Sequence, residues 1–485
     1  MHDISLASGT IEPQSVVAHN NSTFCSARLA EDDTRVLGVS GPAISRFAGA
    51  LETLPDGTTL FPCTPRNAAT LRMQLPWLRP IALGTATSFG FGDRMGLATS
   101  GHIQAMRITG AEALIAPIFA QQSVRENSRT GRTPQQVLDD AMWAVFAAGW
   151  RAPWGADADH VKQINDLAPF VAAGYTFYTI DPSDHVDNAA QTDSLETLRA
   201  KVAELPWGQL HTRYEALHAT YCGQPIDVGS FTIDFHETDL LRALVKYGRA
   251  LVHTAAISQA LAAQLGSQPY DIEMSVDETD TPTSIQEHYF IASQLRALNV
   301  PVVSLAPRFV GKFQKGVDYI GYVGEFASEF ARHAAIMRHF GSYKLSIHTG
   351  SDKFSLYPVI AQLSHGRVHV KTAGTSYLEA LRLAAKQRPA LFRAMLYYAR
   401  EHFEHDRKTY FLDAQPNRVP DSWAMPDAEL PALLEQFDTR QVLHVCFGSI
   451  LDAFGDDLRA MIAEDEQAYR DGLAHHFARH LQPFL

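Results

Sequence analysis

The sequence predicts a closed (β/α)8 barrel that carries an N-terminal extension, an insertion after the fourth strand and a C-terminal helical cap. About eight apolar runs of strand length recur along the chain, and a closed barrel of this class needs eight parallel strands. Longer segments with helical spacing of apolar residues separate these runs, as in parallel α/β folds. With 485 residues, of which 46% are hydrophobic and 19% charged, the chain can bury the large core of such a fold.

The candidate strands are short apolar runs, several of which alternate apolar and polar residues. They lie, in chain order, within residues 80–90, 113–122, 156–163, 174–181, 270–280, 300–309, 343–350 and 367–374. Four further segments place apolar residues three and four positions apart, often with Thr, Ser or Gly at their ends, which is typical of amphipathic helices. These are residues 133–150, 281–299, 324–341 and 376–387, which we expect to form part of the outer ring.

Composition shifts predict how the chain is divided. Residues 1–75 are rich in Thr, Pro and Gly and are expected to form an extension, before a barrel domain over 76–390 that carries the catalytic groups. Within the barrel, residues 184–235 interrupt the alternation with Pro, Gly and Trp, so we expect an insertion there that overhangs the active face. Residues 391–485 are helical and aromatic-rich in pattern, as a terminal cap would be.

Charge and cysteine usage limit the classes of function. A net charge of −12 without any Lys/Arg run argues against a nucleic-acid or anionic-membrane partner, so a small ligand is expected. The most apolar stretch, residues 141–150, is half the length of a membrane span, and the N-terminus lacks an export pattern. The four cysteines show no CxxC spacing, which fits a reducing cytoplasm: Cys25, Cys63, Cys222 and Cys446.

Three candidate strands carry polar side chains toward their C-terminal ends, where barrel enzymes place their catalytic groups. The period of two puts Glu273 and Asp277 on one face, and it pairs His369 with Lys371 in the same way. His348 follows a further strand. A structural core does not need imidazole, carboxylate and ammonium groups together. We therefore expect a metal ion or a sugar to provide their ligand or hydrogen-bond partners.

Imidazoles that converge with a carboxylate suit Zn²⁺, Mn²⁺, Ni²⁺, Co²⁺ or Fe²⁺ better than Mg²⁺, so we expect a divalent transition metal. Most of the 21 histidines should be ordinary hydrogen-bonded side chains, but His348 and His369 stand out because they come late in consecutive strands. His476 and His480 lie four residues apart without an HExxH motif, and we expect them on a helix surface.

The segment with Gly90, Gly92 and Gly96 resembles a dinucleotide-binding fingerprint in spacing. The acidic residue expected at the end of the following strand is absent, so we favour a substrate loop and expect no NAD. This loop would bring Asp93 and Arg94 beside a polar ligand, and we expect Asp277 to bind the substrate as well. Together with Lys353 and Lys371, Arg94 could hold a carboxylate or phosphate group.

Four segments, in this order and spacing, resemble the tagaturonate epimerase family, the metal-dependent sugar-acid enzymes of hexuronate catabolism. They are GADADHVK, IEMSVDETDTPTS, KLSIHTGSDKFSLYP and VHVKTAGTSYLEALR, and the resemblance extends from about Pro80 to the C-terminal helices. It implies that Asp159 is the proton acceptor, that His160 and His348 bind the metal, and that Glu273 is the proton donor. His369 is our candidate for the third ligand on geometric grounds alone.

The reaction that the resemblance implies interconverts D-tagaturonate and D-fructuronate at a hydroxyl-bearing carbon β to the ketone. Enolisation cannot reach that hydrogen, which leaves transient oxidation or retro-aldol cleavage, and the weak glycine fingerprint favours the latter. An aldolase or a ketose isomerase or 4-epimerase could use the same groups, and a non-catalytic subunit that stabilises an aldolase is a further alternative. The sequence leaves the oligomeric state open.

Overall fold

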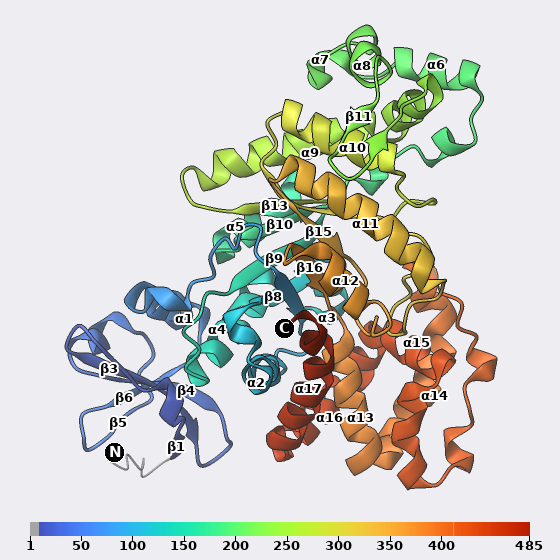
Figure 1. The fold of residues 1–485 in the computed structure, drawn as a ribbon. Helices are drawn as coiled ribbons and strands as arrows, with labels where there is room; N and C mark the ends of the chain where they lie inside the picture. The colour runs from blue at the N-terminus through green and yellow to red at the C-terminus, as the bar shows by residue number, and fades with distance from the viewer. Residues whose placement is uncertain (1–8, 411) are drawn as a thin grey trace.

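A closed barrel of eight parallel strands forms the centre of the molecule, as the sequence predicts (Figure 1). The computed structural model describes residues 9–410 and 412–485. The strands follow one another around the barrel in the order β10-β13-β14-β15-β16-β7-β8-β9. They are β7 Ser88–Gly92, β8 Ala116–Ser123, β9 Gly155–Val161, β10 Phe177–Ile180, β13 Asp271–Val276, β14 Val302–Pro307, β15 Lys344–Ile347 and β16 Val368–Lys371. Each of the eight predicted strand regions overlaps one of them.

Helices between the strands form the outer ring, and each of the four predicted helical segments overlaps one. They are α2 Thr99–Thr109, α3 Val124–Thr130, α4 Pro134–Ala147, α5 Leu167–Ala173, α9 Glu237–Leu265, α10 Ile285–Ala297, α11 Val323–Phe340, α12 Tyr357–Ser364 and α13 Thr375–Gln387. Local sequence explains where two of them begin. α4 has a Thr133/Gln136 capping box, and Ser284 caps the start of α10, where its hydroxyl accepts from the Glu287 N–H.

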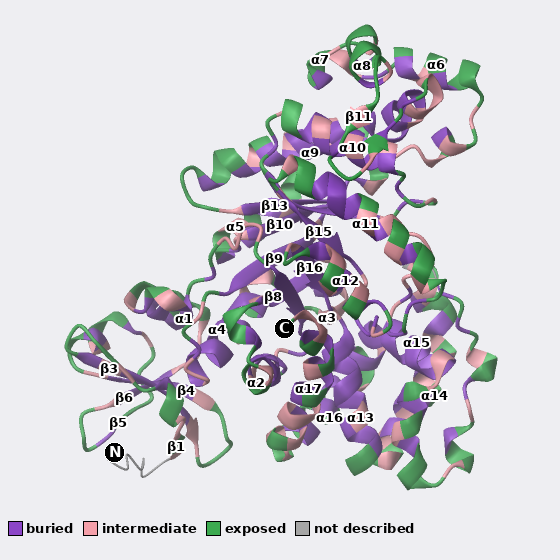
Figure 2. Ribbon diagram, in the orientation of Figure 1, coloured by how far each residue is buried: buried purple, intermediate pink, exposed green. Residues whose placement is uncertain are grey.

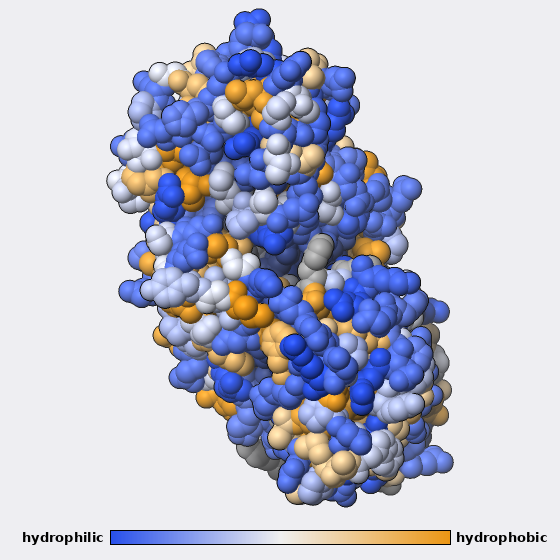
Figure 3. All heavy atoms as spheres, turned by 90° about the vertical axis from the view of Figure 1, so that its right-hand side faces the viewer, coloured by the Kyte–Doolittle hydropathy of each residue, from blue (hydrophilic) through white to orange (hydrophobic). Residues whose placement is uncertain are grey.

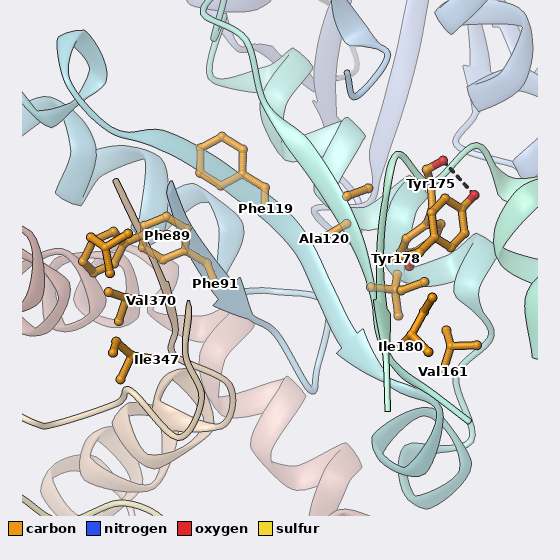
Figure 4. Close-up of a cluster of buried hydrophobic side chains, with 14 of the residues drawn as sticks. Phe89, Phe91, Phe119, Ala120, Val161, Tyr175, Tyr178, Ile180, Ile347 and Val370 are labelled. Carbon is orange, nitrogen blue, oxygen red and sulfur yellow. Dashed lines mark hydrogen bonds between the residues drawn. The ribbon is translucent and has the colours of Figure 1, made fainter. Parts of the chain in front are cut away.

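The outward faces of the strands are apolar and pack against this ring (Figure 4). Phe91 on β7 lies 5.3 Å from Phe477 of the C-terminal helix α17 Glu466–Leu481, measured between ring centroids. Phe119 on β8 meets Trp150 edge to face at 5.4 Å. These strand residues are fully or almost fully buried, so their removal from water contributes to holding helices and barrel together.

The inward faces are polar, which is unusual because barrel interiors are commonly filled by branched apolar side chains. Lys344 donates from Nζ to the Ala86 carbonyl and to Ser88 Oγ, both at 2.8 Å, and Ser88 Oγ lies 2.9 Å from His369 Nδ1. All three side chains are fully buried. Figure 2 shows the barrel strands in the colour of buried residues. The interior is therefore a hydrogen-bonded network that must be satisfied internally.

The N-terminal extension folds as an antiparallel sheet, which its Thr, Pro and Gly content did not indicate. Its strands are β1 Gly9–Ile11, β2 Val17–His19, β3 Ser22–Leu29, β4 Arg35–Ser40, β5 Glu52–Thr53 and β6 Thr59–Pro62, followed by α1 Pro65–Gln74. It stands beside the barrel, at the lower left in Figure 1. An ion pair of 2.6 Å between Arg28 Nη2 and Glu466 Oε2 joins it to α17.

The insertion packs on the outside of the barrel. It comprises α6 Leu195–Ala203, α7 Trp207–Leu210, α8 Tyr214–Tyr221, β11 Ile226–Asp227 and β12 Thr232–Ile233, at the top in Figure 1. Tyr221 donates to Ser293 Oγ of α10 at 2.8 Å, and Arg249 of α9 donates to the Glu204 carbonyl at 3.0 Å. The expectation that the insertion overhangs the active face is therefore wrong for α6–α8, because their partners are helices of the outer ring.

The last part of the chain is helical, as predicted, and closes one side of the barrel. Its helices are α14 Pro389–Asp406, α15 Phe437–Val445, α16 Phe447–Glu464 and α17. The hydroxyl of Tyr469 on α17 donates to the Ser376 carbonyl of α13 at 3.0 Å, and His102 of α2 packs against Phe477 of α17 with ring centroids 4.7 Å apart. These contacts bring α17 beside the strand ends.

The face on the right of Figure 1 is mostly hydrophilic, with scattered hydrophobic patches (Figure 3). Across residues 9–410 and 412–485, no helix combines the length and the apolar character that a membrane crossing requires. All four cysteines are free.

The buried His102 should make stability depend on pH. Burial lowers its pKa to about 4, while the unfolded chain keeps the ordinary value of about 6.5. Because the unfolded state binds the proton more readily, this contribution is present above pH 6.5 and is lost as the pH falls toward 4. From pH 7 to pH 5, the free energy of unfolding should therefore fall by about 2 kcal/mol more in the wild type than in His102→Gln. Urea titration at the two pH values measures this difference.

The exposed His475 provides the control, since His475→Gln should keep the wild-type pH dependence. An unchanged pH dependence in His102→Gln would contradict the assignment.

Candidate active site

The ammonium group of Lys371, the last residue of β16, lies among carboxylates at the C-terminal end of the barrel. Its Nζ is 2.6 Å from Asp159 Oδ1, 3.0 Å from Asp157 Oδ2 and 3.0 Å from Glu273 Oε1. It also donates to Thr179 Oγ1 at 2.5 Å. Burial alone would lower the pKa of Lys371, but Asp157, Asp159 and Glu273 outweigh it and raise the pKa well above the ordinary value. Lys371 is therefore a charged ammonium group at the centre of a carboxylate cluster.

A bulge in β9 turns two consecutive side chains, Asp159 and His160, toward this cluster. Tyr178 and Ile180 of β10 pair with Ala158 and Val161, so β9 fits one extra residue into the same interval. His160 accordingly has a left-handed φ of 54°. In a regular strand Asp159 and His160 would point to opposite faces. Here His160 Nδ1 lies 2.9 Å from Asp159 Oδ1.

His348, just after β15, is held between two carboxylates of the β13 region. Its Nε2 is 2.6 Å from Glu273 Oε1, and its Nδ1 is 3.0 Å from Asp277 Oδ1. Asp277 in turn accepts a short hydrogen bond from the Ser275 hydroxyl. Burial alone would lower the pKa of His348, but Asp277 and Glu273 raise it to about 10. The imidazole thus occupies a strongly negative environment.

His160, Asp277 and His348 together fit a divalent cation. Each offers one ligand atom, and these three atoms lie within 4.8 Å of one another. His160 Nδ1 is buried, and its 2.9 Å contact with Asp159 lacks the geometry of a hydrogen bond. Two imidazoles and a carboxylate are the donor types that first-row transition metals favour. Charge points the same way, because four carboxylates gather here: Asp157, Asp159 and Glu273 share the Lys371 ammonium, and Asp277 contacts His348.

A small cavity opens beside these groups, with a volume of about 20 Å³. It is lined by Asp159, His160, Lys315, Gly316, His348, Thr349, Ser351, Lys371, Ala373 and His444. Two larger surface hollows, of about 380 and 420 Å³, contain none of the predicted site residues. The cavity at the strand ends is therefore the candidate active site, although it is far smaller.

Comparison with known proteins identifies the family. The family model described as tagaturonate epimerase matches residues 14–484. The tagaturonate/fructuronate epimerase of Thermotoga maritima is 40% identical over 456 residues, which cover 93% of this chain and 92% of that protein. The chain belongs to the tagaturonate epimerase family. The family that the four sequence segments resemble is thus confirmed, and the match includes most of the N-terminal extension.

Solved structures agree. The native crystal structure of fructuronate-tagaturonate epimerase UxaE from Cohnella laeviribosi has 35% sequence identity and a TM-score of 0.90, covering 99% of this chain and 97% of that one. A crystal structure of the same protein with one glycerol has 36% identity and a TM-score of 0.90, covering 98% and 96%. The barrel and its additions are therefore the fold of the epimerase family.

Six of the predicted site residues come together in this fold: Asp159, His160, Glu273, Asp277, His348 and Lys371. The two predicted proton-transfer carboxylates do not face each other across a cavity, since Asp159 and Glu273 both contact Lys371 Nζ. Asp159 lines the cavity, whereas Glu273 is fully buried, with its Oε2 accepting from Ser304 at 2.5 Å.

His369, the predicted third ligand, lies apart from this group. A strand rises about 3.3 Å per residue, so a side chain two positions before Lys371 sits one layer deeper in the barrel. There its Nδ1 is 2.9 Å from Ser88 Oγ. Burial lowers the pKa of His369 to about 3. The structure places Asp277, predicted as a substrate-binding residue, where a third ligand beside His160 and His348 would be.

Lys353, predicted to bind substrate, has no donor left for it. Its fully buried Nζ donates to the carbonyls of Gln314, Val317 and Ser351 at 2.9, 2.5 and 2.9 Å. An ammonium group has three N–H bonds, and all of them are used. Lys371 is similar, since four acceptors surround its three N–H bonds.

Asp93 and Arg94 in the glycine-rich loop also serve the fold. Asp93 accepts from the N–H groups of Met95, Gly96 and Ala98 at 3.1, 2.8 and 2.7 Å. Arg94 forms a buried ion pair of 2.8 Å with Glu126 and stacks on Phe447 at 3.6 Å.

The glycines of this loop also have a packing reason. A Cβ atom at Gly92 would lie 2.7 Å from Ala373 Cα, so glycine lets β7 approach the loop after β16.

The structure adds residues that the sequence did not single out. Asp157 precedes Asp159 by two positions on the same strand face, so the period of two could have identified it. Lys315 and His444 line the cavity from a loop and from α15, and no pattern in the sequence relates them to the strand ends. Thr179 and Ser304 look like ordinary strand residues in the sequence.

His476 and His480 of α17 are buried, so the prediction of surface positions is wrong. Both face Asp352, with Nε2 to Oδ1 distances of 3.0 and 3.6 Å. This second group is a poorer cation site, because an arginine already balances the charge of its carboxylate and one of its two imidazoles accepts a hydrogen bond. Asp352 Oδ2 pairs with Arg440 at 2.9 Å, and His480 Nε2 accepts from the Asp352 N–H at 3.0 Å.

The two candidate third ligands can be separated by metal content. Asp277→Asn removes a charged oxygen donor that lies 3.0 Å from His348, so bound divalent metal should fall by at least about tenfold in affinity. His369→Gln should retain metal, because its Nδ1 is engaged with Ser88 one layer deeper. The measurement is metal per chain by atomic emission after dialysis against graded chelator. The reverse pattern would restore His369 as the ligand.

Proposed function

We propose that this chain interconverts D-tagaturonate and D-fructuronate, inverting the hydroxyl-bearing carbon β to the ketone, with a divalent cation held by His160, Asp277 and His348. Family membership supports the substrates. The observation that carries the assignment to this site is the bulge in β9, which presents Asp159 and His160 together at the wall of one cavity. A base and a cation ligand are thereby placed side by side.

A retro-aldol route suits this arrangement. A base takes the proton of the β-hydroxyl group, the bond to the α-carbon breaks, and its electron pair moves onto the ketone-bearing fragment. The aldehyde fragment then turns its other face, the carbon–carbon bond re-forms, and the proton returns to the oxygen. When bound, a divalent cation supplies electrostatic stabilisation for negative charge that develops on the substrate oxygens.

Asp159 is the base in this proposal. Burial alone would raise its pKa, but His160 and Lys371 hold the pKa well below the ordinary value, so the carboxylate is ionised at neutral pH. Lys371 keeps it in place at 2.6 Å. The nearby Asp157 differs, since burial outweighs Lys371 and raises its pKa to about 6. The two carboxylates therefore have different proton affinities at neutral pH.

Glu273 acts through its neighbours in this proposal. Its Oε1 binds His348 Nε2 and Lys371 Nζ, which leaves it oriented toward the two groups that face the cavity. A carboxylate on the second nitrogen of a metal-binding imidazole fixes the ring and its tautomer. Glu273 is thus a positioning residue here, whereas the resemblance implies a proton donor.

The expected partner is a small sugar acid. A net charge of −12 disfavours nucleic acid, and free cysteines suit a reducing compartment, so we place the enzyme in the cytoplasm.

The proposal is tested by following the reaction in D₂O. The protein is loaded with Mn²⁺, Ni²⁺, Co²⁺, Fe²⁺ or Zn²⁺ in turn and transferred to D₂O buffer without free ion. It is then incubated with D-tagaturonate, and products are analysed by NMR. We expect D-fructuronate with no deuterium at the inverted carbon, because the retro-aldol route carries its C–H bond along. Asp159→Asn should keep its metal and lose about 10²–10⁴-fold in turnover.

Other outcomes would contradict parts of this account. Deuterium at the inverted carbon would exclude the retro-aldol route. Accumulation of the two fragments would instead indicate an aldolase, and absence of any conversion with every metal would contradict the function itself.

A further inference from the structure

A sugar acid brings a carboxylate into the site, and its recognition needs a cation that is not already neutralised. The cations considered so far are engaged: Lys371 with three carboxylates, Arg94 with Glu126 and Lys353 with three backbone carbonyls. The cavity wall contains one more positive side chain, Lys315.

Within residues 9–410 and 412–485, no hydrogen bond or ion pair engages Lys315 Nζ. Its side chain is nevertheless partly withdrawn from water. Burial and the nearby Arg125 lower its pKa, with Glu126, Glu278 and Asp277 opposing them. An ammonium group in such a place lacks a counter-ion, and a bound carboxylate would supply one.

The backbone around Lys315 is fixed by buried side chains. Lys353 Nζ donates to the carbonyls on both sides, those of Gln314 and Val317. Arg440 Nε donates a short hydrogen bond to the Gly316 carbonyl, and Gln441 Nε2 donates to the Lys315 carbonyl at 3.3 Å. Four successive carbonyls are thus held, so the loop presents Lys315 without losing much entropy on binding.

His444 of α15 completes this wall. Both of its ring nitrogens are buried and lack a hydrogen-bond partner in the described part of the chain. Burial, Arg94 and Lys315 keep its pKa well below the ordinary value, so the neutral ring offers one N–H donor. The ring is tightly packed, since a Cβ atom at Gly374 would lie 2.6 Å from His444 Cε1.

We propose that Lys315, with His444 beside it, binds the carboxylate group of the sugar-acid substrate. This inference rests on the proposed function and names the part of the site that distinguishes a sugar acid from an uncharged ketose. In this arrangement Lys353 and Arg440 are positioning residues for the loop, and the carboxylate end of the substrate points away from Lys371 toward α15.

The test compares three variants of the metal-loaded enzyme. Lys315→Met removes the charge and keeps the length, and should raise KM for D-tagaturonate by about 10- to 100-fold, the range for a hydrogen bond to a charged group. Lys315→Arg keeps a cation and should recover most of this loss. Lys312→Met is the matched control, because Lys312 lies on the same loop but is exposed and paired with Asp413. It should keep the wild-type KM.

Metal content and melting temperature of each variant separate binding from folding, and both should match the wild type. An unchanged KM in Lys315→Met, or an equal rise in the Met and Arg variants, would overturn the inference while leaving the epimerase function intact. Failure of the wild type to convert D-tagaturonate would instead remove the proposed function, and this inference with it.

Discussion

The burial of the Lys371 ammonium group among Asp157, Asp159 and Glu273 is the interaction on which the rest of the site depends. β16 pairs with β15 and β7, whereas the three carboxylates come from β9 and β13 on the other side of the barrel. The ion cluster therefore spans the interior and links strands that do not pair with one another. Removing one partner of a buried pair leaves an uncompensated charge, which typically costs about 3–5 kcal/mol.

The ion cluster and the candidate cation site lie next to each other but use different side chains. Lys371 neutralises part of the negative charge on the inner side, while Asp277 and the two imidazoles His160 and His348 remain toward the mouth, where a cation fits. The cations near the cavity also differ in role. Lys353 and Arg440 hold the loop backbone from within, whereas Lys315 at the cavity wall has no hydrogen-bond or ion-pair partner among the described residues.

Much of this arrangement follows from the sequence, because period-two alternation in short strands determines which side chains enter the barrel. Glu273, Asp277 and Lys371 were found in that way. Alternation gives the strand face of a side chain but not its depth in the barrel, so it could not show that His369 lies one layer below Lys371, where it binds Ser88. It also cannot foresee a bulge, and family resemblance rather than spacing singled out Asp159 with His160.

Contacts between distant segments were beyond local patterns. His444 reaches the cavity from α15, and His476 and His480 meet Asp352 because α17 packs beside the strand ends. A four-residue spacing indicates that two side chains share a face of one helix, but it does not predict which segment packs against that face. The N-terminal sheet was missed for a related reason, since its composition was considered without the alternation in its strands.

The central claim is that Lys371 is held by electrostatic coupling across the barrel, and a double-mutant cycle between Lys371 and Asp157 tests it most directly. The free energy of unfolding would be measured by urea titration for the wild type, Lys371→Met, Asp157→Asn and the double variant. The account predicts a coupling free energy of about 1–3 kcal/mol, so that the double variant loses less than the sum of the single losses. Additive losses, within about 0.5 kcal/mol, would contradict it.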